Sequence, residues 1–476
     1  MNYQVQLLIN GQWRDSSSQE WLDITNPADE STIGRVAKAS RADLDAALAA
    51  AQTGFAAWRT TSVMERSTYL RKAAALVREH AEEMALMLVH EQGKRLTEAR
   101  IELSGASEVL EWFAEETRRC YGSMIPPRSP ELRQYVQHEP VGPVAAFTPW
   151  NFPINQAVRK IAAALAAGCS IIVKGSEETP VALARFVQVL EQAGLPAGVL
   201  GLVYGVPGDI SEHLIASPVV RKISFTGSTS VGKLLSAQAS AAMKRVSMEL
   251  GGHAPAIICD DADLARSLKL LGVQKFWNAG QACISPSRFL VQAPLYDDAI
   301  AGFQRIAEGY VLGNGLDKAT RMGPLANPRR VAAMQALVDD AVAKGARVVT
   351  GGKAPDGQGY FFAPTVLADV PQDARIFNEE PFGPIAAFAR FDSDAQALQE
   401  ANRLPWGLAA YVFTGSATRG EWFKNAIESG LVGINSIALG YPEQPFGGVK
   451  DSGYASEGGA DALAFYLSSK FVSQTI

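Results

Sequence analysis

Between residues 144 and 250 the chain repeatedly places a short apolar run ahead of a longer stretch with helical spacing. The apolar runs occupy residues 144–149, 170–175, 198–205, 222–227 and 245–250. Helices are expected after Asn151, Pro180, Gly208 and Ser230. Nearly continuous apolar runs that alternate with helices are typical of buried strands in a parallel sheet. The pattern therefore predicts an open α/β sheet, and such sheets bind ligands at the carboxyl ends of their strands.

A second alternating block runs from about Ala254 to Asn435, with a helix expected at residues 262–276 and a strand at 287–292. The chain has 476 residues, which is too long for a single ordinary hydrophobic core. The two blocks therefore predict two α/β lobes.

Two further stretches, residues 131–142 and 471–476, look like isolated strands that neither lobe obviously needs. Unpaired strand edges tend to be covered or to pair with another chain. We therefore expect residues 121–140 and 458–476 to form oligomerisation strands in a homodimer or homotetramer.

The composition is that of an ordinary globular enzyme, with 47% apolar and 20% charged residues. The chain carries 49 Asp and Glu against 44 Lys and Arg, and no basic block interrupts it. A protein that tracks nucleic-acid phosphates needs such a block, so no nucleic-acid partner is expected.

The first residues contain no cationic segment followed by an apolar run, so no signal peptide is expected. The most apolar stretch, residues 161–174, is shorter than a bilayer span and is interrupted by Gly168. It predicts a buried helix that leads into a buried strand. We expect a cytoplasmic protein with no membrane partner.

The chain contains four widely spaced cysteines and five histidines. The cysteines form no CxxC pair and the histidines form no HxxxH-type pair. This spacing argues against a disulfide framework and a zinc site, and it fits a reducing compartment. No metal site is expected.

The segment from Gly227 to Lys233, GSTSVGK, matches part of a phosphate-binding loop. The complete motif continues with Ser or Thr to hold magnesium, whereas this chain has Leu234. A strand-to-helix turn still offers backbone N–H groups and a helix dipole to a diphosphate, so a dinucleotide such as NAD is favoured over ATP. The alternative is that Gly227 only closes a tight turn.

Lys174 and Glu177 follow a predicted strand, in the sequence VKGSEETP. A carboxylate at this place accepts hydrogen bonds from the ribose hydroxyls of a dinucleotide and repels the 2′-phosphate of NADP. The alternative is a solvated acidic loop ahead of a helix.

Cys283 lies among small and polar residues after a predicted helix, which indicates a loop where a thiolate is accessible. Cys120, Cys169 and Cys259 fit ordinary packing instead. Glu249 is a lone acid at the end of an apolar strand and is a candidate base, because a buried carboxylate is costly unless it is paired or used.

Asn151 follows a predicted strand in FTPWNFP. Its side-chain amide suits an oxyanion, and Asn is equally a routine helix N-cap, so both interpretations stay open.

Seven motifs occur in order: FTPWNFP, VKGSEETP, FTGSTSVGK, MELGGHAP, GQACIS, EEPFGP and PFGGVKDSG. With these motifs the chain resembles the aldehyde dehydrogenase superfamily over nearly its whole length. Within it, the chain is most similar to succinate-semialdehyde and α-ketoglutarate-semialdehyde dehydrogenases. The resemblance implies a Rossmann-like NAD-binding domain (residues 1–120 and 141–252), an α/β catalytic domain (253–440) and a small β oligomerisation element. It implies NAD as the cofactor, with NADP as the alternative, and a small-molecule aldehyde as the substrate.

The resemblance also implies that Cys283 is the nucleophile, that Asn151 and the Cys283 backbone N–H form an oxyanion hole, and that Glu249 activates the deacylating water. Lys174 and Glu177 would hold the adenosine ribose. The remaining cofactor contacts that it implies are Gly208, Gly227 and Ser228 near the adenine and diphosphate, Trp150 and Leu250 along the cofactor path, Glu380 on the nicotinamide ribose and Phe382 beside the ring. An acid at position 249 favours release of a free carboxylic acid over transfer to coenzyme A.

The chain departs from its relatives in the substrate pocket. Enzymes for acidic semialdehydes typically clamp the far carboxylate with two arginines, and Arg159 matches only the first. Trp277 stands where the second arginine is expected, and Tyr441 stands where a serine often precedes PFGG. Tryptophan cannot replace a bidentate arginine. The two aromatic residues therefore favour, as an alternative to an acidic semialdehyde, an aromatic or longer apolar aldehyde.

Alternatives of a different kind also stay open. A thiol hydrolase or acyltransferase would use Cys283 with His253. A protein that keeps the dehydrogenase fold without activity, or a coenzyme A-acylating dehydrogenase, would share most of the motifs.

Overall fold

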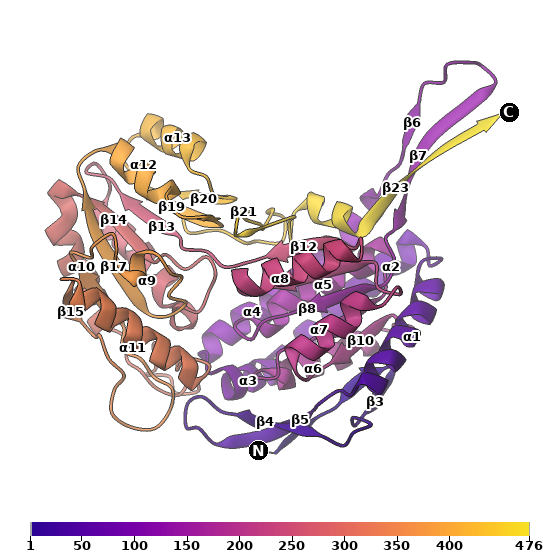
Figure 1. Cartoon of the computed structure of the whole chain (residues 1–476), viewed down its shortest axis with the longest axis horizontal. Coiled ribbons are helices and arrows are strands. Elements are labelled where there is room, and N and C mark those ends of the chain that lie inside the picture. Colours follow the sequence, from indigo (N-terminus) through magenta and orange to yellow (C-terminus); the bar gives the residue numbers. More distant parts are fainter. Residues whose placement is uncertain (1, 476) are drawn as a thin grey trace.

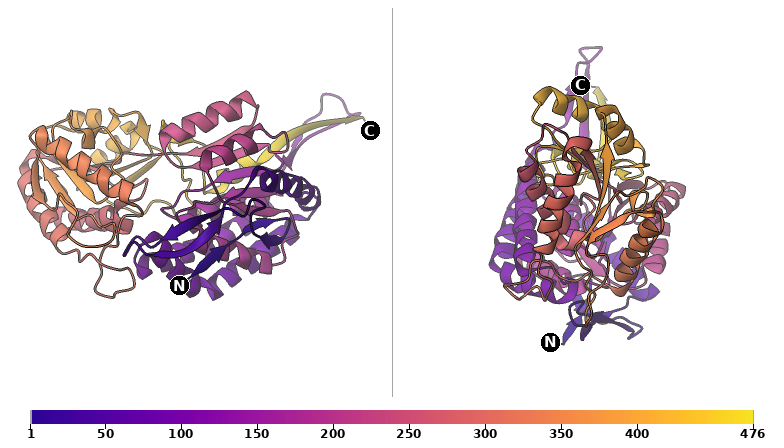
Figure 2. Two further views of the ribbon diagram at one scale, coloured as in Figure 1. Left: turned by 60° about the horizontal axis from the view of Figure 1, so that its bottom comes forward. Right: turned by 90° about the vertical axis from the view of Figure 1, so that its left-hand side faces the viewer.

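The computed structural model describes residues 2–475, so the two outermost residues of the predicted domains, 1 and 476, lie outside the described part. Two large sheets, each with its own helices, form two lobes side by side (Figures 1 and 2). The α/β class predicted from the sequence is confirmed.

The first sheet has eight strands in the order β22-β12-β11-β8-β9-β10-β2-β3. The five predicted apolar runs form its parallel centre, β8 Val144–Phe147, β9 Ile171–Lys174, β10 Leu200–Val203, β11 Lys222–Thr226 and β12 Arg245–Glu249. Antiparallel strands complete it: β2 Leu7–Ile9, β3 Gln12–Arg14 and β22 Gly453–Tyr454. The carboxyl ends of the parallel strands meet at one edge of the sheet, as expected from the sequence.

Helices cover both faces of this sheet in two contacting groups (Figure 1). One group contains α1 Arg41–Trp58, α7 Pro207–Ala216 and α8 Thr229–Ala241. The other contains α2 Val63–Glu79, α3 Ala81–Gln92, α4 Leu96–Glu116, α5 Pro153–Ala167 and α6 Pro180–Gln192. Two of these helices begin with capping boxes, in which Ser40 pairs with Asp43 and Ser62 with Glu65. Each box satisfies backbone N–H groups that a helix start otherwise leaves free.

The predicted buried run at residues 161–174 forms the end of α5 and all of β9, separated by Gly168 with φ of 94°. None of the described helices is both long and apolar enough to cross a membrane.

The second sheet has seven strands in the order β15-β16-β17-β14-β13-β19-β20. Their bounds are β13 Pro255–Ile258, β14 Arg288–Gln292, β15 Arg347–Thr350, β16 Thr365–Ala368, β17 Ile385–Phe391, β19 Ala409–Phe413 and β20 Leu431–Ile434. The helices are α9 Leu264–Phe276, α10 Tyr296–Glu308, α11 Pro328–Ala343, α12 Asp394–Asn402 and α13 Ala417–Ala426. One apolar core ends at Leu250 and resumes at Ala462, while the other extends from Ala254 to Phe446. The chain therefore passes from one lobe to the other beside the carboxyl end of β12.

Smaller elements lie around the lobes. A three-stranded sheet contains β1 Tyr3–Val5, β5 Thr32–Ala37 and β4 Trp21–Thr25, and β18 Trp406–Gly407 pairs with β21 Val449–Lys450. The short 3₁₀ helices are η1 Thr117–Arg119, η2 Trp277–Gly280, η3 Ala293–Leu295, η4 Arg375–Phe377 and η5 Ala460–Tyr466.

The two strands that neither lobe needs pair with each other in a projecting sheet. β7 Leu132–Pro140 is antiparallel to β23 Leu467–Thr475 along its whole length, and β6 Ser123–Ile125 pairs with the other side of β7. This sheet extends beyond the first lobe as an arm (Figure 1). The C-terminal strand begins at Leu467 and not near residue 458, because the apolar side chains of η5 are buried in the core of the first lobe.

Candidate active site

A cavity of about 520 Å³ lies between the lobes at the carboxyl edge of the first sheet. The first lobe contributes the residues that follow β8, β11 and β12, and the second lobe contributes Cys283 and the residues around α11 and Phe382. The predicted site residues that line the cavity are Trp150, Asn151, Gly227, Ser228, Glu249, Leu250, Cys283, Glu380 and Phe382. The three candidate catalytic residues, far apart in the sequence, therefore face one space.

Cys283 is presented by a sharply turned segment. Asn278, Ala279 and Gly280 all have positive φ values, of 50°, 55° and 73°. A Cβ atom on Gly280 would lie 2.2 Å from the carbonyl oxygen of Gly383, so the turn requires glycine there. The thiol of Cys283 is half-buried, and burial followed by the carboxylates of Glu249 and Glu380 raises its pKa. The backbone N–H groups of Cys283 and Ile284 lower this pKa, so they face the sulfur.

The same turn is fixed to Asn151. The Nδ2 atom of Asn151 donates to the carbonyl oxygen of Gln281 at 3.0 Å, and Asn278 Nδ2 donates to the Asn151 carbonyl oxygen at 2.9 Å. The N-cap of α5 is Phe152, and no side chain caps it. The N-cap interpretation of Asn151 is therefore wrong. The second N–H of its amide has no acceptor among residues 2–475.

Glu249 ends β12 with a side chain that is almost fully buried. Among the described residues neither of its carboxyl oxygens has a hydrogen-bond partner. Burial raises its pKa well above the ordinary value, and the nearby Glu457 raises it further, while Lys160 and Arg159 lower it. A buried, unpaired carboxyl group with a raised pKa is a strong signal of a functional acid or base.

A buried ion pair that was not predicted from the sequence lies behind Glu249. Lys160 of α5 pairs with Glu457 and also donates to Thr226 Oγ1 at 2.7 Å. Both partners are buried, and they lie 297 positions apart in the chain. A lysine inside the apolar run of α5 was the available signal, because a buried charge needs a partner.

A second missed pair holds the turn at Asn151. Lys94 donates to Glu102 at 2.5 Å and to the Asn151 carbonyl oxygen at 2.9 Å. Glu102 also accepts from the backbone N–H groups of Ile154 and Asn155, at 3.0 and 3.1 Å. A carboxylate from α4 therefore caps the positive end of α5 and fixes the residues that precede it.

On the other side of the cavity, Glu380 Oε1 accepts from the backbone N–H of Gly252 at 3.1 Å. Burial raises the pKa of Glu380 to about 7, against the lowering effects of the Gly252 N–H, Arg330 and Lys275. A Cβ atom on Gly251 would lie 2.5 Å from Glu380 Oε2, so glycine there admits the carboxylate. Phe382 contacts the Trp150 ring edge-to-face, with centroids 5.5 Å apart.

Comparison with known proteins decides the family. The model of the aldehyde dehydrogenase family matches residues 13–472. The chain belongs to the aldehyde dehydrogenase family.

Two similar proteins differ in the substrates that their names give. A putative 4-(hydroxymethyl)benzenesulfonate dehydrogenase of Comamonas testosteroni is 47% identical, covering 98% of this chain and 97% of its own. The NADP⁺ succinate-semialdehyde dehydrogenase of Escherichia coli K12 is 41% identical, covering 99% and 98%.

The solved structures agree on the fold. An E. coli NADP-dependent enzyme superposes with a TM-score of 0.98 at 41% identity, covering 100% of this chain and 98% of its own. The NAD⁺ complex of a Bacillus cereus aldehyde dehydrogenase has a TM-score of 0.97 at 34% identity, covering 100% and 97%. A pyridine nucleotide is therefore the cofactor class of this aldehyde dehydrogenase.

Three predicted cofactor contacts of the dehydrogenase lie outside the set that lines the 520 Å³ cavity. Lys174 Nζ donates to Glu177 Oε2 at 2.5 Å just after β9, and Gly208 is exposed in the first turn of α7. The residue next to Glu177 joins the lobes, because Glu178 accepts from Asn327 at 3.2 Å and pairs with Arg329.

The three predicted substrate-pocket residues do not line this cavity either. The guanidinium of Arg159 is buried and donates to Asn155 Oδ1 at 3.0 Å and to the carbonyl oxygens of Glu457 and Gly440 at 2.6 and 2.5 Å. Trp277 contacts Phe152 edge-to-face at 5.9 Å, and Tyr441 is 53% exposed.

Both ring nitrogens of His253 already have hydrogen-bond partners. Its Nδ1 atom is 2.6 Å from Ser287 Oγ, and its Nε2 atom is 2.9 Å from the carbonyl oxygen of Ile376. Burial lowers its pKa well below the ordinary value. With both ring nitrogens occupied, His253 cannot serve as the base for Cys283, which removes the basis of the thiol-hydrolase alternative. Within residues 2–475, no three His, Cys, Asp or Glu side chains are grouped so as to hold a metal ion.

Proposed function

We propose that this chain oxidises an aldehyde to a free carboxylic acid with NAD, through a thioester on Cys283. The observation that carries the proposal is the single cavity that brings Cys283, Asn151 and Glu249 together with Glu380. The cavity offers a nucleophile, an oxyanion donor and a base within one space, which is the set that covalent acyl chemistry requires.

In the proposed mechanism the Cys283 thiolate adds to the aldehyde carbon and gives a tetrahedral oxyanion. The free N–H of the Asn151 amide and the Cys283 backbone N–H stabilise that oxygen, each by about 3–4 kcal/mol in comparable sites. Bound NAD supplies the hydride acceptor. Glu249 then takes a proton from the water that hydrolyses the thioester, and its raised pKa makes it a stronger base than an ordinary carboxylate.

The cavity fits the cofactor on two grounds. Among the described residues, the carboxylate of Glu380 is fixed by one backbone N–H, and its Oε2 atom remains for ribose hydroxyls. Ser228 is the N-cap of α8 and makes no side-chain capping bond, so the N–H groups of this helix start remain for a diphosphate.

We propose NAD over NADP because of Glu177. Its carboxylate pairs with Lys174 at the end of β9, where a 2′-phosphate would meet a negative charge. Replacement of Glu177 by alanine is expected to raise kcat/KM with NADP relative to NAD by about tenfold, since like charges close together cost about 1 kcal/mol per charge even in water. Initial rates with both cofactors measure the ratio. The Glu308→Ala variant, which removes an exposed acid from α10, is the control, and an unchanged ratio in Glu177→Ala would contradict the assignment.

For the substrate we propose an aromatic or apolar-bodied aldehyde. Each of the three nitrogens of the Arg159 guanidinium donates to a protein oxygen, so this group is not free to clamp a small semialdehyde carboxylate. The relative that acts on a hydroxymethylbenzenesulfonate supports this choice, and the succinate-semialdehyde relative represents the alternative.

The test is a panel of aldehydes followed by NADH formation. Benzaldehyde and a medium-chain alkanal are expected to give at least about tenfold higher kcat/KM than succinate semialdehyde or α-ketoglutarate semialdehyde, because a missing charge partner costs 1 kcal/mol or more. The reverse order would mean that Arg159 leaves its partners to bind substrate.

We also propose that a second copy of the chain covers the projecting sheet of β6, β7 and β23. Met124, Ile125 and Phe471 are exposed on it at 69%, 37% and 56%, and a narrow sheet buries little of itself. Light scattering is expected to give a multiple of 50.9 kDa, and a monomer mass would contradict the proposal.

All four cysteines are free thiols, which supports the reducing cytoplasm as the location.

A further inference from the structure

A second cavity, of about 580 Å³, lies against the turn that presents Cys283. It is formed between α4 of the first lobe and α9 and α10 of the second. Its lining residues are Arg95, Glu98, Ile101, Val273, Phe276, Trp277, Arg305, Ile306, Gly309, Tyr310 and Arg321. We call it the arginine cavity, because it contains three arginines and one carboxylate.

The charges of the arginine cavity are unbalanced. Arg305 and Arg321 are exposed, and within residues 2–475 neither side chain has a hydrogen bond or an ion pair. Arg95 pairs with Glu98 at 3.3 Å, but its Nε atom is buried without a partner in the described chain. Glu98 is buried and already accepts from the backbone N–H groups of Arg95 and Asn278. The guanidinium groups of Arg305 and Arg321 are therefore available to bind the anionic group of a ligand.

The floor of the arginine cavity is aromatic. The rings of Phe276 and Tyr310 lie 4.8 Å apart, and Trp277 stands beside them with a buried Nε1–H that no described residue accepts. Ile101 and Val273 are 56% and 52% exposed at the same cavity. An apolar floor with a cationic rim is complementary to an aromatic ring that carries a carboxylate or a sulfonate.

The arginine cavity adjoins the catalytic residues. Trp277 contacts Phe152, the neighbour of Asn151, and Asn278 bonds to both Glu98 and the Asn151 carbonyl oxygen. Trp277 therefore lines the arginine cavity and contacts the residue next to Asn151, which lines the cavity that contains Cys283.

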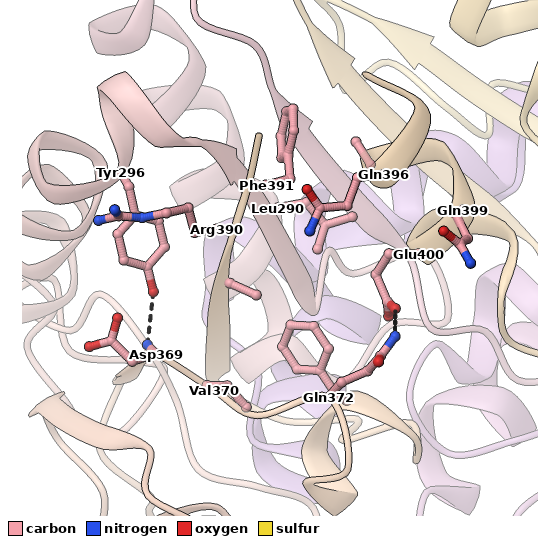
Figure 3. A pocket seen from close by; sticks show the side chains of 13 residues that line it. Leu290, Tyr296, Asp369, Val370, Gln372, Arg390, Phe391, Gln396, Gln399 and Glu400 are labelled. Carbon is pink, nitrogen blue, oxygen red and sulfur yellow. Dashed lines mark hydrogen bonds between the residues drawn. The ribbon is translucent and has the colours of Figure 1, made fainter. Parts of the chain in front are cut away.

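Another cavity, of about 540 Å³ on the second lobe, differs from the arginine cavity in the pairing of its charges (Figure 3). Its charged side chains already have partners: Asp369 pairs with Arg347, Arg390 with Asp297 and Glu400 with Arg403. Gln372 donates to Glu400 at 2.8 Å, the Tyr296 hydroxyl accepts from the Asp369 N–H at 2.8 Å, and Arg390 lies over the Tyr296 ring. Unpaired charge therefore distinguishes the arginine cavity from this one.

We propose that the arginine cavity recognises the anionic end of an aromatic aldehyde, with Arg305 and Arg321 attracting its carboxylate or sulfonate and Trp277 contacting its ring. This inference rests on the proposed function and names the substrate class for it. Clefts of one sign of charge raise the association rate of oppositely charged ligands, and the effect weakens as salt increases.

The test compares two substrates that differ by one charge, benzaldehyde and 4-formylbenzoate. In the double variant Arg305→Gln/Arg321→Gln, the ratio of kcat/KM for 4-formylbenzoate to kcat/KM for benzaldehyde is expected to fall by about tenfold. The fall is expected to shrink at high ionic strength. The double variant Arg41→Gln/Arg266→Gln removes the same charge from exposed positions outside the cavity, and its ratio is expected to stay within about twofold of the wild type.

A direct binding measurement separates this inference from the proposed function. Calorimetric titration of benzenesulfonate into the Cys283→Ala protein is expected to detect binding that the Arg305→Gln/Arg321→Gln changes weaken by about tenfold. An unchanged ratio of kcat/KM, or equal losses for both substrates, overturns the inference and leaves the proposed function intact. Failure of the wild type to oxidise any aldehyde of the panel overturns the proposed function, while the titration still decides whether the arginine cavity binds an aromatic anion.

Discussion

Replacement of Cys283 by alanine is expected to lower kcat for aldehyde oxidation by a factor on the order of 10⁶, the loss that follows removal of the nucleophile in a comparable covalent mechanism. The reason is that Cys283 is the only thiol among residues 2–475 that lines the cavity. Cys169 and Cys259 are buried in the two apolar cores, and Cys120 lies near the end of α4, away from the cavity lining. The measurement is NADH formation with a saturating aldehyde. Mass spectrometry of the quenched wild-type enzyme is expected to find the acyl group on the peptide that contains Cys283.

Cys120→Ala is the matched control, because Cys120 is also half-buried. It is expected to keep nearly full activity. Binding of NAD to Cys283→Ala, followed by quenching of protein fluorescence, is expected to stay near the wild-type value. Retention of more than about one part in a hundred of the activity by Cys283→Ala would rule out the thioester mechanism, because general acid–base and electrostatic effects alone do not supply the remainder.

Replacement of Glu249 by glutamine is expected to lower the steady-state rate by about 10²–10⁴-fold, the usual contribution of a positioned general base. Glutamine keeps the shape of the side chain but cannot take a proton from water. If Glu249 acts in hydrolysis of the thioester, the first turnover remains fast. Rapid mixing is then expected to give a burst of NADH equal to the number of active sites, with the acyl enzyme accumulating.

The pH dependence gives an independent test of the same group. Burial raises the pKa of Glu249, and the group acts as a base only when it is deprotonated. The wild-type rate is therefore expected to fall as the pH is lowered through that raised pKa, and the glutamine variant is expected to lack this limb. An exposed control, Glu308→Gln, is expected to keep the wild-type profile. Loss of the NADH burst in Glu249→Gln would instead place this residue before thioester formation.

Much of the fold follows from local patterns in the sequence. The five apolar runs form the parallel centre of the first sheet because each run is short, apolar on both faces and followed by a helix. The capping boxes at Ser40 and Ser62 form because the required partner lies three residues away. The candidate site follows from the same logic. Residues placed directly after parallel strands meet at one edge, so Asn151 and Glu249 face the same cavity.

The motifs were also sufficient to identify the family, because several short patterns in a fixed order are far more specific than any one of them. They did not determine the substrate. Trp277 and Tyr441 depart from the relatives, but the sequence alone does not say what surrounds them.

Only the tertiary structure decided which charged groups are free. The guanidinium of Arg159 donates to carbonyl oxygens that lie 281 and 298 positions away in the chain. Lys160 pairs with a carboxylate 297 positions away. His253 is committed to Ser287 and Ile376, while Arg305 and Arg321 meet no partner within residues 2–475. Periodicity determines which face of a helix or strand is buried, because burial of apolar area follows local spacing. Pairing of a buried charge depends on the atoms that folding brings within about 3 Å, and local spacing carries no information about them.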